Sequence, residues 1–212
     1  MDEISNKTLA ILLIAAIVIS LGGTLISLNR LARIRAPITG FATTDTAGVN
    51  LTISSLAEVN FTIDEINWGT GTVVSGKTSC TLDSYSNPID TVNCSSFTAQ
   101  PDGLVLENIG NKNVTLNITT GKTAATFPGG TNPVYQFNVS DKDPNSCAGS
   151  WEIVQGAWQD AQVTNLSICN ETNGFGSEAA NDELYIDVRV VIPSDASGYK
   201  SDVITAEIAQ IN

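Results

Sequence analysis

Hydrophobic positions follow two different periods along this 212-residue chain, and the change lies near Pro37. Residues 8–29 carry no charged side chain and consist mostly of Leu, Ile, Ala and Val. About 20 such residues form a helix long enough to cross a bilayer, and Leu28, Leu31 and Ile34 continue the run at helical spacing. We predict a hydrophobic helix within residues 1–36 and a linker over residues 37–48. The side chains expected to pack against lipid or against other helices are Leu9, Leu12, Leu13, Ile17, Leu21, Ile26, Leu28 and Leu31.

Beyond residue 48 the hydrophobic period is two. In residues 49–53, 59–63 and 114–118, large apolar residues alternate with Asn and Thr, as in half-buried antiparallel strands. Other apolar runs predict strands over 72–74, 78–82, 104–107, 134–139, 184–192 and 203–211. Turn-forming residues between 107 and 114, and between 192 and 203, predict that the flanking strands pair.

These elements together predict a fold class. We expect a mainly β protein, in which an immunoglobulin-like antiparallel β-sandwich over residues 49–212 follows one long N-terminal hydrophobic α-helix. A jelly roll is the alternative. The stretch from Trp151 to Asn181 has no clear period and predicts no element.

The charge distribution supports the same division of the chain. Residues 1–36 have a net charge of +2, whereas the remainder holds six basic and twenty acidic residues, a net charge of −14. Such a domain repels phosphate backbones, so nucleic acid is not expected as a partner. An acidic surface of this kind is most often simply solvated.

Histidine is missing from the sequence. Imidazole is the usual general base near neutral pH and the commonest transition-metal ligand, so its absence excludes His-based triads, His-ligated haem and His-dependent zinc hydrolysis. No spacing of Ser, Lys or carboxylates indicates another catalytic mechanism. We therefore expect a protein that is not an enzyme, with no cofactor, no metal site and no small-molecule substrate.

All four cysteines, Cys80, Cys94, Cys147 and Cys169, lie in the predicted β-domain. Because none forms a CxxC pair and the chain has no His, two disulfides in an oxidising compartment are a better interpretation than a zinc site. Three pairings are conceivable. We favour Cys80–Cys94 with Cys147–Cys169, since each closes a short polar excursion.

Sequons of the form Asn-x-Ser/Thr are frequent after the predicted helix. They occur at Asn50, Asn60, Asn93, Asn113, Asn117, Asn138, Asn165 and Asn170. Such motifs mark acceptor sites for N-linked glycans in exported proteins. A strand that presents Asn and Thr outward also creates this motif by its period alone, so an interpretation without glycans remains.

Residues 141–152 partly match the spacing of a calcium-binding loop, with Asp141, Asp143, Asn145 and Glu152 at its ligand positions. Ser146 replaces the turn glycine, and Pro144 interrupts the loop. We therefore prefer a polar turn over a calcium site.

The residues on either side of the N-terminal helix bear on whether it is cleaved and how it is oriented in a membrane. The residues before it are acidic rather than basic and the apolar run is long for a signal peptide, so we expect the helix to be retained. Three Arg follow the helix and only Lys7 precedes it, which by the positive-inside rule favours a cytoplasmic β-domain. The sequons and cysteines favour the outside, and we follow them.

The order of a hydrophobic helix, a Thr- and Gly-rich stalk and an Asn/Thr-rich β-domain with local cysteine pairs resembles small archaeal cell-surface proteins. It is also similar to archaeal pilins and related filament subunits. The resemblance implies helices bundled into a filament core, with glycosylated β-domains outside. It suggests a homopolymeric subunit of a surface filament or envelope layer. The alternative is a single-pass, membrane-anchored adhesion module that binds through Trp68, Trp151, Trp158 and residues 170–181.

Overall fold

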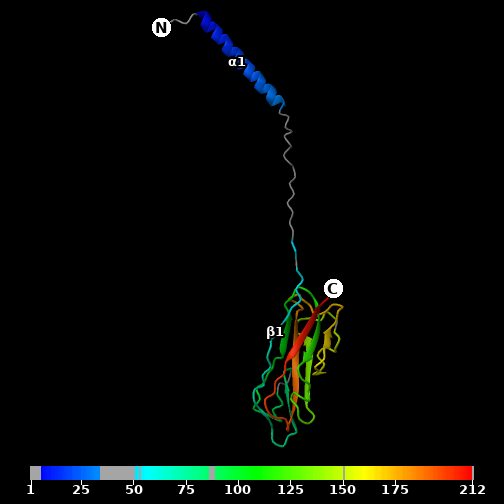
Figure 1. Cartoon of the computed structure of the whole chain (residues 1–212). Helices are drawn as coiled ribbons and strands as arrows, with labels where there is room; N and C mark the ends of the chain where they lie inside the picture. Colours follow the sequence, from blue (N-terminus) through cyan, green and yellow to red (C-terminus); the bar gives the residue numbers. More distant parts are fainter. Residues whose placement is uncertain (1–5, 34–50, 53, 86–88, 150, 212) are drawn as a thin grey trace. The chain divides into compact units, whose positions relative to one another are not determined.

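The computed structural model describes residues 6–33, 51–52, 54–85, 89–149 and 151–211 (Figure 1). The chain forms two compact units, Met1–Thr52 and Ile53–Asn212. In the first unit the described secondary structure is helix α1, Asn6–Arg33. The predicted linker 37–48 lies outside the described residues.

Helix α1 has 28 residues, which at about 1.5 Å per residue gives a length of about 42 Å. The Thr24 hydroxyl donates to the Ser20 carbonyl at 2.5 Å, so one of the few polar side chains is satisfied within the helix. Gly22 and Gly23 leave open space at the helix surface. The predicted hydrophobic helix is confirmed, beginning at Asn6.

The described part of the second unit is built from β-strands, and every strand pair in it is antiparallel. Its strands are β1 (Val59–Ile63), β2 (Thr72–Val73), β3 (Ser79–Asp83), β4 (Cys94–Ser95), β5 (Leu104–Asn108), β6 (Val114–Thr120), β7 (Val134–Asp141), β8 (Gln159–Asp160), β9 (Leu166–Cys169), β10 (Glu183–Pro193) and β11 (Ile204–Gln210). The mainly β class is therefore confirmed.

Two sheets form the body of this domain. The larger has the order β1-β5-β10-β7-β8, and β3 also pairs with β10. Strand β10 is long enough to pair with β5 through Glu183–Ile186 and with β3 through Arg189–Pro193. The smaller sheet has the order β11-β6-β9, and β2 and β4 form a separate two-stranded ribbon. The immunoglobulin-like connectivity within this class stays a prediction.

The main hydrophobic core lies between the two sheets. Leu116 and Ile118 from the smaller sheet pack with Phe137, Leu184 and Ile186 from the larger sheet, and all five side chains are fully buried. Apolar residues at every second position of β6 and β10 supply this core, as the period of two predicts. A smaller cluster around Cys80, Leu82 and Cys94 lies next to the β2–β4 ribbon.

Both predicted strand pairs were wrong in their pairing, although their strands exist. Strand β5 lies in the larger sheet and β6 in the smaller, and the same separation applies to β10 and β11. Each connection therefore passes from one sheet to the other. Each strand bonds instead to a partner distant in sequence: Leu104–Asn108 to β1 and β10, and Ile204–Gln210 to β6.

The predicted strand over residues 49–53 is not found where it can be examined. Leu51 and Thr52 are outside any strand, and residues 49, 50 and 53 lie outside the described part of the chain. The structure also contains β4, β8 and β9, which the sequence did not predict. They are short, with two, two and four residues, although the equally short β2 was predicted.

Candidate functional site

The surface of helix α1 is apolar on all sides. Of the eight residues expected to pack, seven have described side chains, and these are between 49% exposed at Ile17 and 63% exposed at Leu13 and Ile26. Leu31 lies in the last turn of the same helix. Residues Asn6–Arg30 are long and apolar enough to span a membrane, a test that a signal sequence would also pass. A fully apolar helix needs an apolar environment around its whole circumference.

Two disulfides hold the β-domain, and the favoured pairing is confirmed. Cys80 of β3 bonds to Cys94 of β4, and Cys147 bonds to Cys169 at the end of β9. The bonded residues are 14 and 22 positions apart, so each bridge closes a local loop. By restricting the unfolded chain, each bridge should raise the free energy of unfolding by about 3 kcal/mol.

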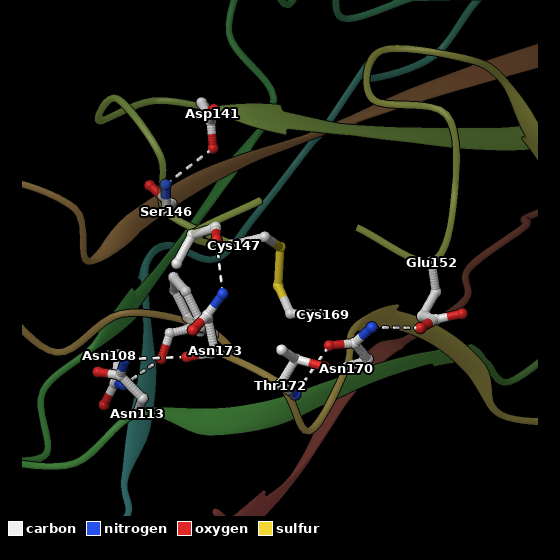
Figure 2. Close-up of a disulfide and its surroundings, with 12 residues drawn as sticks. Asn108, Asn113, Asp141, Ser146, Cys147, Glu152, Cys169, Asn170, Thr172 and Asn173 are labelled. Carbon is white, nitrogen blue, oxygen red and sulfur yellow. Dashed lines mark hydrogen bonds between the residues drawn. A yellow bond between two sulfur atoms is a disulfide. The ribbon is translucent and has the colours of Figure 1, made fainter. Parts of the chain in front are cut away.

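Figure 2 shows the surroundings of the Cys147–Cys169 bridge, where the suspected calcium loop lies. The Ser146 amide donates to Asp141 Oδ1 at 3.0 Å, and the Ser146 hydroxyl lies within donating distance of the carbonyls of Asp143 and Glu183, at 2.7 and 2.6 Å. Glu152 Oε1 instead accepts from the Asn170 amide at 2.6 Å, on the far side of the bridge in this view. The carboxylates at the first and last ligand positions are thus engaged separately, and residues 141–149 form the preferred polar turn. Among the described residues, no three of Cys, Asp or Glu form a group that could hold a metal ion.

The sequon asparagines occupy different environments. Asn60, Asn113 and Asn165 are exposed, and Asn117 is half-buried on β6. Two further half-buried asparagines use their amide groups locally: Asn93 donates to Asp90 and Asn170 donates to Glu152. Asn50 lies outside the described residues.

Asn138 differs from all of these because it is only 1% exposed. Asn138 lies on β7 and pairs with Asp187 of β10, and both residues point away from the main core. Trp158 comes from the segment beside β7, yet its ring stacks on Arg189 of β10, 4.4 Å from the ring centroid to the guanidinium carbon. Asn138 itself is covered by protein, as its 1% exposure shows. An attached sugar would have no room there, so we remove Asn138 from the set of glycan sites.

Burial also changes the acidity of the neighbouring carboxyl group. Asp187 is 4% exposed, and this burial raises its pKa to about 6. The Ser84 hydroxyl donates to Asp187 Oδ1 at 3.1 Å and opposes the rise, whereas the charges of Asp83 and Asp102 add to it. Neither polar atom of the Asn138 amide has a hydrogen-bond partner within the described residues. Asn138 and Asp187 are therefore buried within the β-domain rather than exposed in a cleft.

The three tryptophans do not gather on one surface. Trp68 packs between the two smaller clusters, Trp151 packs against the main core, and Trp158 stacks on Arg189. Each has a packing role in the domain. A contact surface built from the three together is therefore not assembled in this structure.

Searches of protein-family models, curated proteins and solved structures found no match to the chain. Its function therefore has to be inferred from its own residues.

Proposed function

We propose that this protein is a non-catalytic structural subunit of the cell surface, forming a pilus-like filament or an envelope layer. Helix α1 holds it in the membrane or among the helices of other copies, and the β-domain faces the exterior. Self-association and membrane contact are its main interactions. The single observation that carries this proposal is the exposure of α1, whose large apolar side chains have no cover within the described part of their own unit.

The energetic case rests on those side chains. Burying one exposed Leu or Ile completely contributes about 1.5–3 kcal/mol. Seven or more such residues on one helix therefore supply enough free energy to hold an assembly or an anchor without any ligand. The distribution of these residues around the helix suits both lipid and a bundle of like helices, because either surrounds it completely.

An extracellular position for the β-domain is supported by its cysteines. Both disulfides are formed, and the described residues contain no free cysteine. Disulfides persist in oxidising compartments and are rare in the cytosol of most cells. The Asn- and Thr-rich outward positions of β6 fit a solvated, glycan-bearing surface.

Fractionation of native cells tests the proposal. We expect the chain in the membrane pellet or in fibres sheared from the surface and seen by negative-stain imaging, with residues 6–33 present in its intact mass. A soluble mature chain that begins after residue 36, or free thiols in a cytosolic fraction, would contradict it.

A membrane-anchored adhesion module is the second candidate, and the loop over residues 194–203 favours it. The chain enters the β-domain beside the turn after β5, where the backbone N–H of Asn111 donates to the Leu56 carbonyl at 3.0 Å. The connection between β10 and β11 lies at the opposite end of the domain (Figure 1), and Tyr199 within it is 93% exposed. An exposed aromatic far from the entry point suits a contact with a partner. Protein that needs detergent for extraction and forms no fibres would favour this candidate.

A further inference from the structure

The outer face of the smaller sheet is open, whereas the outer face of the larger sheet is closed at its centre. On β6 the inward side chains Val114, Leu116 and Ile118 are fully buried, so the alternate residues face outward. Their outward partners on β11, Thr205 and Glu207, are exposed. On the larger sheet, by contrast, the outward residues Asn138 and Asp187 are 1% and 4% exposed.

Three sequons place both their Asn and their hydroxyl residue on this open face. Two of these sequons lie along β6 and begin at Asn113, the residue just before the strand. Their Asn and Thr residues occupy every second position, namely Asn113, Thr115, Asn117 and Thr119. On the neighbouring strand, Ser167 pairs directly with Asn117. The third sequon, which begins at Asn165, thus ends on the same face.

A hydrogen bond shows that Asn165 itself lies on this face. Its side-chain amide donates to Glu207 Oε2 at 2.6 Å, and Glu207 of β11 pairs with Asn117 of β6. By strand geometry, Asn113 and Asn117 are about 13 Å apart and Asn117 and Asn165 about 8 Å apart. All three amides therefore lie within one small area of the sheet.

We propose that the outer face of the sheet β11-β6-β9 is the glycan-bearing face of this protein, with N-linked oligosaccharides on Asn113, Asn117 and Asn165. The inference rests on the proposed export of the β-domain. The donor is a lipid-phosphate-linked oligosaccharide. The Asn Nδ2 bonds to its anomeric carbon and loses one proton as the lipid phosphate leaves.

Glycans here would also direct assembly. Among the described strands, β11 is an edge of its sheet and pairs with β6 alone. Such an edge is a template for pairing with another chain. Bulky hydrated sugars beside it would oppose contacts between copies on this face and leave α1 as the main element for association.

Site-resolved glycopeptide mass spectrometry of the full chain from its native source tests the inference. We expect modified Asn113, Asn117 and Asn165 and bare Asn138. A glycan on Asn138, or bare asparagine at two or more of the three proposed sites, would overturn it. If these asparagines are bare while the chain remains in membranes or fibres with both disulfides formed, only the glycan face fails. Free thiols in the cytosol would refute the proposed function as well.

A matched pair of variants in the native host isolates one site. Thr119→Ala destroys the sequon of Asn117, whereas Thr119→Ser preserves it. Because Thr119 faces outward from β6, both variants keep the core intact. We expect the intact mass to fall by one oligosaccharide in the alanine variant only. Equal loss of glycan in both variants, or no loss in either, would contradict attachment at Asn117.

Discussion

In helix α1 the side chains of Leu9, Ile19 and Ile26 are 60%, 74% and 63% exposed, whereas in the β-domain Leu116, Phe137 and Ile186 are fully buried. The two regions have similarly apolar residues but use them differently. The β-domain covers its own core with two sheets and adds two disulfides. In the described part of its own unit the helix has no partner surface, and under the proposed function lipid or other copies supply its environment. On this proposal, folding and assembly are divided between the two parts of the chain.

A charge in the middle of α1 should have the largest effect of the changes considered, because it weakens insertion of the helix into the membrane. Ile19→Arg places a guanidinium at a position that is now 74% exposed and apolar. Its cost of about 2.5–3.5 kcal/mol at a membrane centre corresponds to a roughly 100-fold fall in the equilibrium constant for insertion into the membrane. Sedimentation with membranes at a series of lipid concentrations measures this constant.

The matched variant is Ile19→Leu, which should sediment like the original protein. Thermal unfolding of the β-domain should be the same in both variants, since α1 belongs to the other unit. An equilibrium constant for insertion that is the same in the arginine and leucine variants would show that the helix is not embedded.

Removing the disulfides tests how far the β-domain is self-sufficient. The pair Cys147→Ala and Cys169→Ala should lower the free energy of unfolding by about 3 kcal/mol, and Cys80→Ala with Cys94→Ala by slightly less, because the closed loop is shorter. Urea unfolding of the detergent-solubilised protein measures both losses. Association through α1 should survive each change, and a loss of association together with the bridge would refute the division.

The pH dependence of the β-domain should carry the signature of Asp187, whose folded pKa of about 6 exceeds its ordinary value of 3.8. Between these values the folded state binds the proton that the unfolded state has lost. Stability should therefore fall as pH rises from about 4 to 6, by roughly 2–3 kcal/mol. Thermal unfolding measured at a series of pH values follows this fall.

Asp187→Asn keeps a polar acceptor for the Ser84 hydroxyl and removes the buried charge. We expect it to raise the melting temperature at pH 7 and to leave it nearly unchanged at pH 4. Asp83 also has a pKa raised by burial, so a shallower fall should persist in the variant. Identical pH profiles for the two proteins would show that Asp187 is ionised at low cost.

The smallest effect is expected at the surface ion pair between Lys142 and Glu183, whose Nζ and Oε2 atoms are 2.6 Å apart. Their side chains are 31% and 22% exposed, so water and salt weaken the attraction. Lys142→Gln should lower the free energy of unfolding by less than about 1 kcal/mol, and the difference should shrink in high salt. A loss as large as that of a disulfide would mean that this corner of the domain depends on charge rather than on packing.

The sequence by itself determined the elements whose hydrophobic period is long. Helix α1 and strands β1, β6, β7 and β10 were predicted because alternation or a continuous apolar run of five or more residues identifies a face without knowledge of its partner. The cysteine pairing was also predictable, since both bridges join residues close in sequence. Each of these features depends on local chain geometry.

Only the tertiary structure decided which strands share a sheet and which sequons reach solvent. Asn117 and Asn138 have similar sequence surroundings, yet Asn117 is half-buried on the outer face of β6, whereas Asn138 is only 1% exposed on β7. Strands β5 and β6 likewise belong to different sheets, although a short turn joins them. The physical reason is the same in both cases: contacts between residues distant in the chain are set by packing, and a local period does not encode them.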